Sequence, residues 1–337
     1  NYLSQMPPIT QLLATTRFDA NRFDFTVHEG HVGELKIDEG TVTITDMEKA
    51  TKLLSISTLL RGPVQSALDL IARPRLNIPQ RFKQASKGAK GRHETHLNIA
   101  LPLKSSLKAE DIRVTGKSNI KDLAISNLFR GKGIDNGWVT LSVIDNSLSA
   151  SGKINFVGTP AQFKWTENLA RRDNFTRRLE ASLTANKKLA TLFGLDDNEI
   201  WEGSIPLTLV YEARRDNKAS LSAELDLKNT RFKLPGFEWE KPPGRPSKAR
   251  FAASFDGATI RSVDDFKIEA GAFSTSGKIT FAEPLKDSAL SIDTLKLHNF
   301  RLGATKLAAD VRRDKNRRYM ITVKGGRLNA APFINRL

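Results

Sequence analysis

The residues best suited to chemistry in this 337-residue chain are two pairs of histidines, His28 with His31 and His93 with His96. Imidazole nitrogens are common zinc ligands, but a pair needs further ligands to hold the metal. On a β-strand, positions i and i+3 point to opposite faces, so neither pair is preset to share an ion. No third potential ligand lies at a sequence spacing from either pair that is typical of a metal site. We therefore expect no metal and no other cofactor.

Motifs for nucleophilic or nucleotide chemistry are also missing from the sequence. There is no Gly-x-Ser-x-Gly turn of the kind that exposes a catalytic serine, and Gly131-Lys-Gly133 stands alone, without the rest of a phosphate-binding loop. The chain has no cysteine, which excludes disulfides and thiolate sites and suits a reducing compartment or a bacterial envelope protein. The sequence predicts that the protein is not an enzyme.

The net charge is +16, because 53 Lys and Arg residues face 37 Asp and Glu residues. Such an excess favours an anionic partner: nucleic acid, lipid headgroups or an acidic polymer. Four residues in one stretch are candidates for contact with headgroups: Arg312, Arg313, Arg317 and Arg318. A nucleic-acid site would interleave aromatic with basic residues, and only Phe175 and Tyr319 lie near the basic clusters, so we expect no nucleic acid.

The elements that must carry these residues are β-strands. Residues 137–156 alternate apolar and polar positions on both sides of Asp145-Asn146, which predicts a hairpin with one apolar and one polar face. Variants of this unit recur along the chain, and short helical patterns are few. An antiparallel sheet with one apolar face must cover that face. Either two sheets form a sandwich, or one sheet curls around an apolar ligand.

The organisation along the chain suggests two β segments, residues 1–165 and 166–337. A mostly helical insertion is expected near 47–73, interrupted at Gly62-Pro63, and a long loop or boundary near 237–247. The phrases Ala150-Ser-Gly-Lys-Ile-Asn-Phe156 and Thr275-Ser-Gly-Lys-Ile-Thr-Phe281 are nearly the same, which suggests two related halves. No run of about 18 apolar residues predicts a membrane-spanning helix.

Several phrases, in this order and spacing, resemble the AsmA-like superfamily of envelope proteins, and the YhdP-type branch in particular. They are Arg61-Gly-Pro-Val-Gln-Ser-Ala-Leu-Asp-Leu-Ile71, Gly131 to Trp165, Gly203-Ser-Ile-Pro, Leu225-Asp-Leu-Lys-Asn229, Pro235-Gly-Phe-Glu-Trp-Glu-Lys-Pro242 and Gly325-Gly-Arg-Leu-Asn329. The resemblance covers nearly all of the chain from about Phe23 onward. We expect the chain to be an interior segment of a longer protein.

The resemblance implies a bridge-like lipid-transfer protein, anchored in the inner membrane of a Gram-negative bacterium and crossing the periplasm. Its phospholipid-guiding part would be an elongated, twisted antiparallel sheet, mainly β and curled into an apolar groove with a few short helices. The candidate groove residues are Leu97, Ile99, Leu101, Val139, Leu141, Val143, Leu148, Ile154, Phe156, Leu207, Leu209, Leu225, Leu227, Ile279, Phe281, Ile321 and Val323.

Two other functions stay open on the sequence alone. One is a closed β-sandwich that binds another envelope protein, and the other, ranked third, is a nucleic-acid-binding β protein. The partners implied by the first interpretation are phospholipids, the membrane through other parts of the parent protein, and other envelope proteins.

Overall fold

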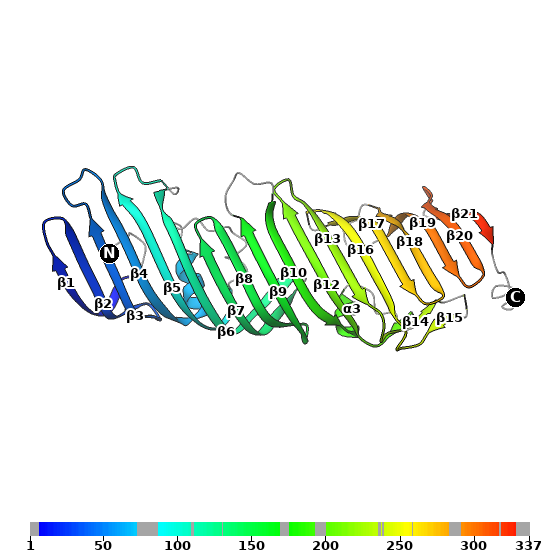
Figure 1. Cartoon of the computed structure of the whole chain (residues 1–337), viewed down its shortest axis with the longest axis horizontal. Coiled ribbons are helices and arrows are strands. Elements are labelled where there is room, and N and C mark those ends of the chain that lie inside the picture. Colours follow the sequence, from blue (N-terminus) through cyan, green and yellow to red (C-terminus); the bar gives the residue numbers. More distant parts are fainter. Residues whose placement is uncertain are drawn as a thin grey trace. The chain divides into compact units, whose positions relative to one another are not determined.

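The structure is a computed structural model that describes residues 7–72, 87–108, 111–129, 131–168, 175–192, 200–234, 237, 239–257, 259–282, 291–316 and 318–327. The chain divides into two compact units, residues 1–171 and 172–337. Each unit is built mainly of antiparallel strands, with short helices beside them (Figure 1). The predicted fold class, mainly β, is confirmed.

The first unit is a meander in which each strand pairs antiparallel with the next along the chain. Its described elements are β1 (Ile9–Phe18), β2 (Arg22–Val32), β3 (Leu35–Thr45), β4 (Lys52–Pro63), α1 (Val64–Ile71), β5 (Lys90–Leu103), β6 (Arg113–Phe129), β7 (Lys132–Ile144), β8 (Ser147–Phe156) and β9 (Thr159–Asn168).

The second unit repeats this plan and adds a small sheet of three strands, β11, β14 and β15. Its described elements are β10 (Phe175–Ala185), α3 (Lys187–Leu192), β11 (Trp201–Glu202), β12 (Ile205–Arg214), β13 (Lys218–Asp226), β14 (Arg231–Leu234), β15 (Trp239–Lys241), β16 (Ser247–Asp256), β17 (Thr259–Ala270), β18 (Phe273–Phe281), β19 (Ile292–Leu302), β20 (Thr305–Arg313) and β21 (Tyr319–Arg327).

The predicted hairpin is formed by β7 and β8, and its register follows the apolar alternation. Val139, Leu141 and Val143 lie opposite Gly152, Ala150 and Leu148 respectively. Asp145 turns the chain with a positive φ of 50°, a conformation that Asp tolerates better than most residues. All these apolar side chains therefore share one face of the sheet, and Thr140 and Ser142 point to the other.

The strands are not regular ribbons. β6 shifts register three times against β7 between Ile120 and Phe129, and β7 shifts once against β8 near Asn136, which has a φ of 49°. Such bulges bend a strand and increase its twist. Ile134 on one side of the bulge still lies opposite Phe156, and Val139 on the other side lies opposite Gly152. The apolar residues of β7 before and after the bulge therefore lie on the same face of the sheet.

The repeated Ser-Gly-Lys phrase has a physical reason. A Cβ at Gly152 would lie 2.1 Å from the carbonyl oxygen of Trp138, and one at Gly277 would lie 2.2 Å from that of Lys296. No real side chain tolerates such a contact. In both units, a neighbouring backbone therefore approaches the strand so closely at this point that only glycine fits.

Two predictions about local structure were wrong. Residues 52–63 form strand β4 rather than helix, and only Val64–Ile71, which follows Pro63, is helical. Leu54, Ile56 and Leu60 alternate on one face of β4, but Leu53 and Leu59 fill intervening positions and hide the period. The stretch 237–247 is not wholly a loop, because Trp239–Lys241 forms β15 and pairs with β14.

Candidate functional site

The apolar face of the first unit brings together all nine candidate groove residues of that unit. Leu97 on β5 lies opposite Thr58 of β4 and Gly116 of β6, and Gly116 lies opposite Val143. The same alternation continues through β8, where Leu148, Ile154 and Phe156 share the face. Positions far apart in sequence are therefore brought together on one predominantly apolar face.

These side chains are half-buried rather than buried. Of the nine, Val139 alone is buried, with 3% of its surface exposed, and the other eight keep intermediate exposure. Side chains in a closed core are covered on every side. Each of these eight side chains therefore keeps part of its surface accessible to water or to an apolar ligand.

Helix α1 covers one part of this face. Val64 is 4% exposed and belongs to a cluster with Leu123, Ile134 and Val139, against which Leu68 also packs. Leu70 packs against a second cluster around Val27. Pro63 stands at the N-cap position with φ −65° and ψ 140°, so the chain leaves β4 extended and turns directly into the helix.

A chain of polar side chains interrupts the apolar face beside α1. His93 Nδ1 lies 2.7 Å from Thr95 Oγ1, which donates to Ser118 Oγ at 2.8 Å. His93 is 6% exposed, and its buried Nε2 has no hydrogen-bond partner in the described part of the chain. Burial lowers the pKa of His93 below its usual 6.5, so the ring is neutral near pH 7. The sequence spacing did not reveal this cluster.

The apolar face of the second unit carries the remaining eight candidates. Leu207 and Leu209 on β12 face Leu225 and Ala223 on β13, and Ile279 on β18 faces Leu295 on β19. Leu227 is buried at 6% exposure, whereas Ile321 and Val323 on β21 are 64% and 55% exposed. Leu207, Leu209, Leu225, Ile279 and Phe281 are half-buried.

The small sheet closes part of that face with aromatic rings. Phe232 and Trp239 from β14 and β15 lie 6.0 and 5.4 Å from the ring of Phe273, and Phe237 lies 5.3 Å from Phe300. Phe273 is 2% exposed and Phe300 9%. Aromatic pairs at these distances and tilts add to the energy of simple burial. This cluster was not predicted.

A buried lysine attaches the small sheet. Lys241 is 1% exposed, and its Nζ donates to the carbonyl oxygens of Leu227 at 2.7 Å and Lys228 at 3.1 Å. Burial lowers the pKa of Lys241, an effect that the charge of Asp226 opposes. The ammonium group thus holds β15 to the end of β13.

Residues 1–322 match the family model described as YhdP protein, which is nearly the whole chain. The chain belongs to the YhdP protein family. The resemblance read from the sequence is therefore confirmed. No curated protein and no solved structure matches the chain. Membership of the YhdP family makes this a bacterial envelope protein, in a family that is not known as one of enzymes.

In this YhdP-family chain, His93 and His96 are split between the two faces of the sheet, as the spacing predicted. At the other pair, β2 shifts register against β1 between Glu29 and Val27, which breaks the simple alternation on which the prediction rested. His93 is buried on the apolar face, and His96 is exposed on the other face. His28 is exposed and hydrogen-bonds Thr15 at 2.9 Å, whereas His31 is half-buried. Within the described ranges, no three His, Asp or Glu residues are grouped so that they could hold a metal, and no helix is long and apolar enough to cross a membrane.

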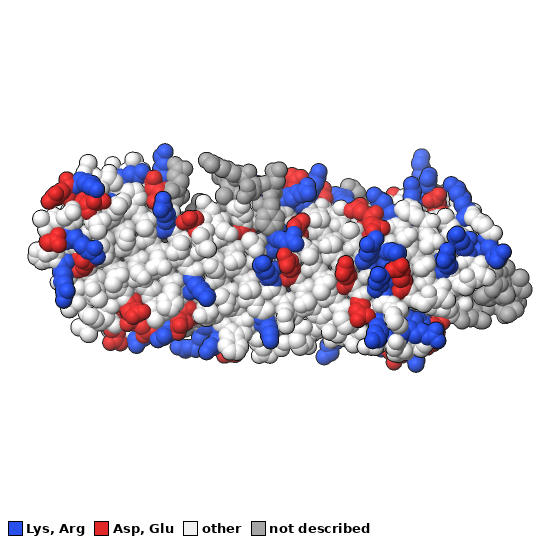
Figure 2. Space-filling view, in the orientation of Figure 1, with Lys and Arg blue, Asp and Glu red and all other residues white. Residues whose placement is uncertain are grey.

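The basic stretch predicted to contact headgroups lies where β20 is joined to β21, and two of its three described arginines have polar partners. Arg313 donates to Ser291 at 2.9 Å, and Arg318 pairs with Asp314 at 3.0 Å. Arg312 is exposed. Arg317 lies outside the described residues. In Figure 2, the charged side chains of the first unit lie mostly near the strand ends, with a band of uncharged surface between them.

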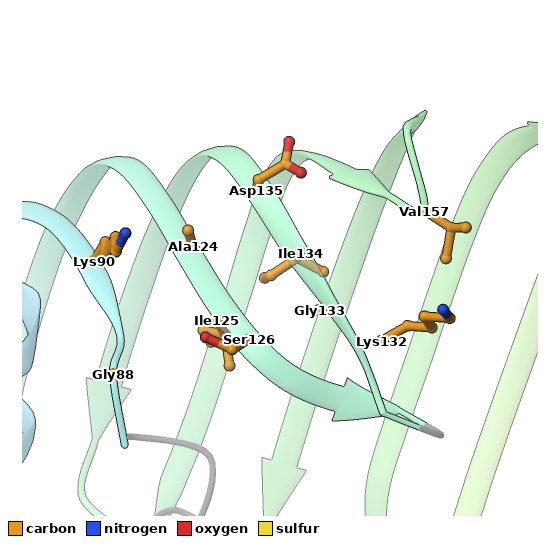
Figure 3. A pocket seen from close by; sticks show the side chains of 10 residues that line it. All are labelled: Gly88, Lys90, Ala124, Ile125, Ser126, Lys132, Gly133, Ile134, Asp135 and Val157. Carbon is orange, nitrogen blue, oxygen red and sulfur yellow. The ribbon is translucent and has the colours of Figure 1, made fainter.

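A pocket of about 360 Å³ lies where β5, β6 and β7 come close to one another. Figure 3 shows Lys90 on one side of Ile125 and Ile134, and Lys132 and Val157 on the other. Lys90 pairs with Ala124, so both point to the face opposite Ile125 and Ile134. The pocket therefore mixes side chains from the two faces of the sheet, and Ile125 and Ile134 belong to the apolar cluster beside α1.

Proposed function

We propose that this segment carries out non-enzymatic transport of phospholipids between the inner and outer membranes, with its apolar β faces shielding the acyl chains. The parent protein would be anchored in the inner membrane of a Gram-negative bacterium, and the segment would lie in the periplasm. Membership of the YhdP family supports a role in the envelope.

The observation that carries this proposal is the half-burial of an ordered apolar face. Leu97, Ile99, Leu101, Leu141 and Leu148 lie on one face of the first unit, and each stays partly open. Removing apolar area from water stabilises by about 25 cal/mol per Å². A broad apolar surface left open by the fold marks a binding site for an apolar ligand, and an acyl chain suits one that continues across many strands.

A closed β-sandwich that binds another protein is less well supported. A sandwich would cover the apolar face with a second sheet about 10 Å away. In the described parts of the two units, the covers are local: α1 in the first and the small aromatic sheet in the second. The remaining apolar side chains of each face keep intermediate exposure.

The test uses two neighbouring residues on β8. Phe156 packs with the apolar cluster of the first unit, and Asn155 points to the other face. We expect phospholipid to co-purify with the wild-type protein from the bacterial envelope, as native mass spectrometry would show. Phe156→Asp should lose that lipid but stay folded, because water still reaches the new carboxylate; the cost is about 1 kcal/mol.

Asn155→Asp is the matched control, since it adds the same charge on the polar face and should leave the lipid content unchanged. In a closed core, Phe156→Asp would bury an unpaired charge and cost about 4 kcal/mol or more. Global unfolding of Phe156→Asp, or a wild-type protein free of lipid, would therefore contradict the open groove.

A further inference from the structure

The polar face of the first unit carries a row of cations around an exposed tryptophan. The basic row consists of Arg92 on β5, Lys121 on β6, Trp138 on β7 and Lys153 on β8. Arg92 lies directly opposite Lys121, and Trp138 lies directly opposite Lys153. Lys121 Nζ lies 5.7 Å from the centroid of the Trp138 ring, which joins the two pairs. Four consecutive strands therefore contribute one side chain each to a single line.

The cations of this row have no acidic partner among the described residues. The carboxylate of Glu94, two positions along β5, is held by Arg61 at 2.8 Å. Like charges directly opposite each other in a sheet are destabilising, as are Arg92 and Lys121 here. The fold keeps this repulsion at the surface, where an anionic ligand would relieve it.

Trp138 is 65% exposed, which is unusual for so large an apolar ring. Lys121 lies over the ring, and most of the ring faces water. An exposed indole on the polar face of a sheet can stack against a ring of a bound ligand. The intramolecular packing of the first unit does not use it, because the ring lies on the face opposite Val139 and Leu141.

The surface beside the row is rich in uncharged hydrogen-bonding groups. Asn119, Thr140 and Ser151 form the next line across β6, β7 and β8, and Thr140 donates to Asn119 at 3.2 Å. Gln162 on β9 lies opposite Lys153, and Lys164 lies opposite Ser151. Hydroxyl, amide and ammonium groups are thus mixed around the ring.

We propose that this surface binds an acidic glycan, a polymer of sugar rings that carries carboxylates. The cations would pair with the carboxylates, the indole would stack on a sugar ring, and the hydroxyl and amide groups would bond the sugar hydroxyls. A bilayer surface would use the cations but not the line of Asn119, Thr140 and Ser151. A nucleic-acid strand calls for several stacking aromatics, and the row has one.

The experiment is co-sedimentation of the full chain with insoluble peptidoglycan, which carries sugar rings and carboxylates. A second sample has its carboxylates converted to amides, which removes the charge and keeps the rings. We expect binding to the native polymer, weaker binding to the amidated one, and further weakening as salt rises.

Three variants locate the binding surface. Lys121→Glu with Lys153→Glu should weaken binding about tenfold at low salt, and less at high salt, because exposed ion pairs are screened. Trp138→Ala should weaken binding at every salt concentration, since stacking does not depend on screening. Lys296→Glu with Lys306→Glu changes the charge equally at exposed positions of the second unit and should bind like wild type.

Circular dichroism checks that each variant is folded. Equal binding to the native and amidated polymers would overturn the proposal, and so would wild-type binding by the Lys121/Lys153 variant. Stronger, Trp138-dependent binding to anionic phospholipid vesicles or to a single-stranded oligonucleotide would also overturn it, by assigning the row to that class of partner.

Discussion

The two units present the same kind of apolar face but cover it differently. In the first unit, α1 lies on the face through Val64 and Leu68, and a polar chain headed by His93 lies nearby. In the second unit, the small sheet places Phe232 and Trp239 against Phe273. The apolar face is thus covered by a cluster of packed aromatic rings in the second unit and by one short amphipathic helix in the first.

This difference indicates which side chains stabilise each unit. A cluster of buried rings such as Phe273 and Phe300 supplies several kcal/mol at one place. The first unit spreads smaller contributions over many half-buried aliphatic side chains. A face of that kind tolerates a change of ligand or of water content better than a ring cluster does. We therefore expect the first unit to be the more adaptable surface and the second the more rigid one.

The largest expected effect comes from breaking the ring cluster. Phe273→Ala removes a ring that is 2% exposed and contacts Phe232, Trp239 and Phe300. The free energy of unfolding of the second unit should fall by about 3–5 kcal/mol. Hydrogen exchange read by mass spectrometry would show faster exchange in β14, β15 and β18 and unchanged exchange in β4–β8. Equally faster exchange in β4–β8 would contradict the prediction that this ring cluster stabilises the second unit in particular.

The next effect concerns the attachment of the small sheet. Lys241→Met keeps the length of the side chain but leaves the carbonyls of Leu227 and Lys228 without their charged donor. We expect a loss of about 2 kcal/mol, typical of a hydrogen bond to a charged group. Denaturant unfolding would measure it. Lys233→Met on the exposed side of the same small sheet is the control, and should change stability little because its pair with Glu240 is exposed.

A smaller effect is expected on the open face. Ile99→Ala removes methyl and methylene groups from a side chain that is only half-buried, so it should cost about 1 kcal/mol without lipid. If acyl chains cover this face, the cost should rise when phospholipid is bound. Thermal melts with and without phospholipid would show it, and a cost independent of lipid would argue against contact at Ile99.

Period two along the strands was enough to predict a mainly β fold and the residues that share a face, but it left a closed sandwich and a single curled sheet open. Val139, Leu141 and Val143 alternate cleanly, and the structure places them together. Long-range contacts could not be predicted in this way. Lys241 follows Trp239-Glu240 in a Pro- and Gly-rich stretch, and nothing local indicates that its ammonium reaches the end of β13. For β4, the extra leucines at 53 and 59 obscured the period until the pairing with β5 was known.

The smallest effect tests the polar chain that distinguishes the first unit. With Thr95 donating to Ser118, its oxygen accepts from His93, so the neutral ring carries its proton on Nδ1. Protonation would place a second N–H on Nε2, which is buried and has no acceptor among the residues that the structure describes. The pKa of His93 is accordingly held below 6.5, mainly by burial. The unfolded chain, with an ordinary histidine, binds the proton first as the pH falls.

Stability of the first unit should therefore be full above pH 6.5 and should fall as the pH drops from 6.5 toward the lowered pKa of the folded state. Each pKa unit of depression corresponds to about 1.4 kcal/mol. His93→Leu removes this dependence, whereas His96→Leu on the exposed face keeps it. Urea unfolding followed between pH 7.5 and about 5 would compare the slopes. If wild type and His93→Leu lose stability in parallel, the polar chain has no part in the response of this face to acid.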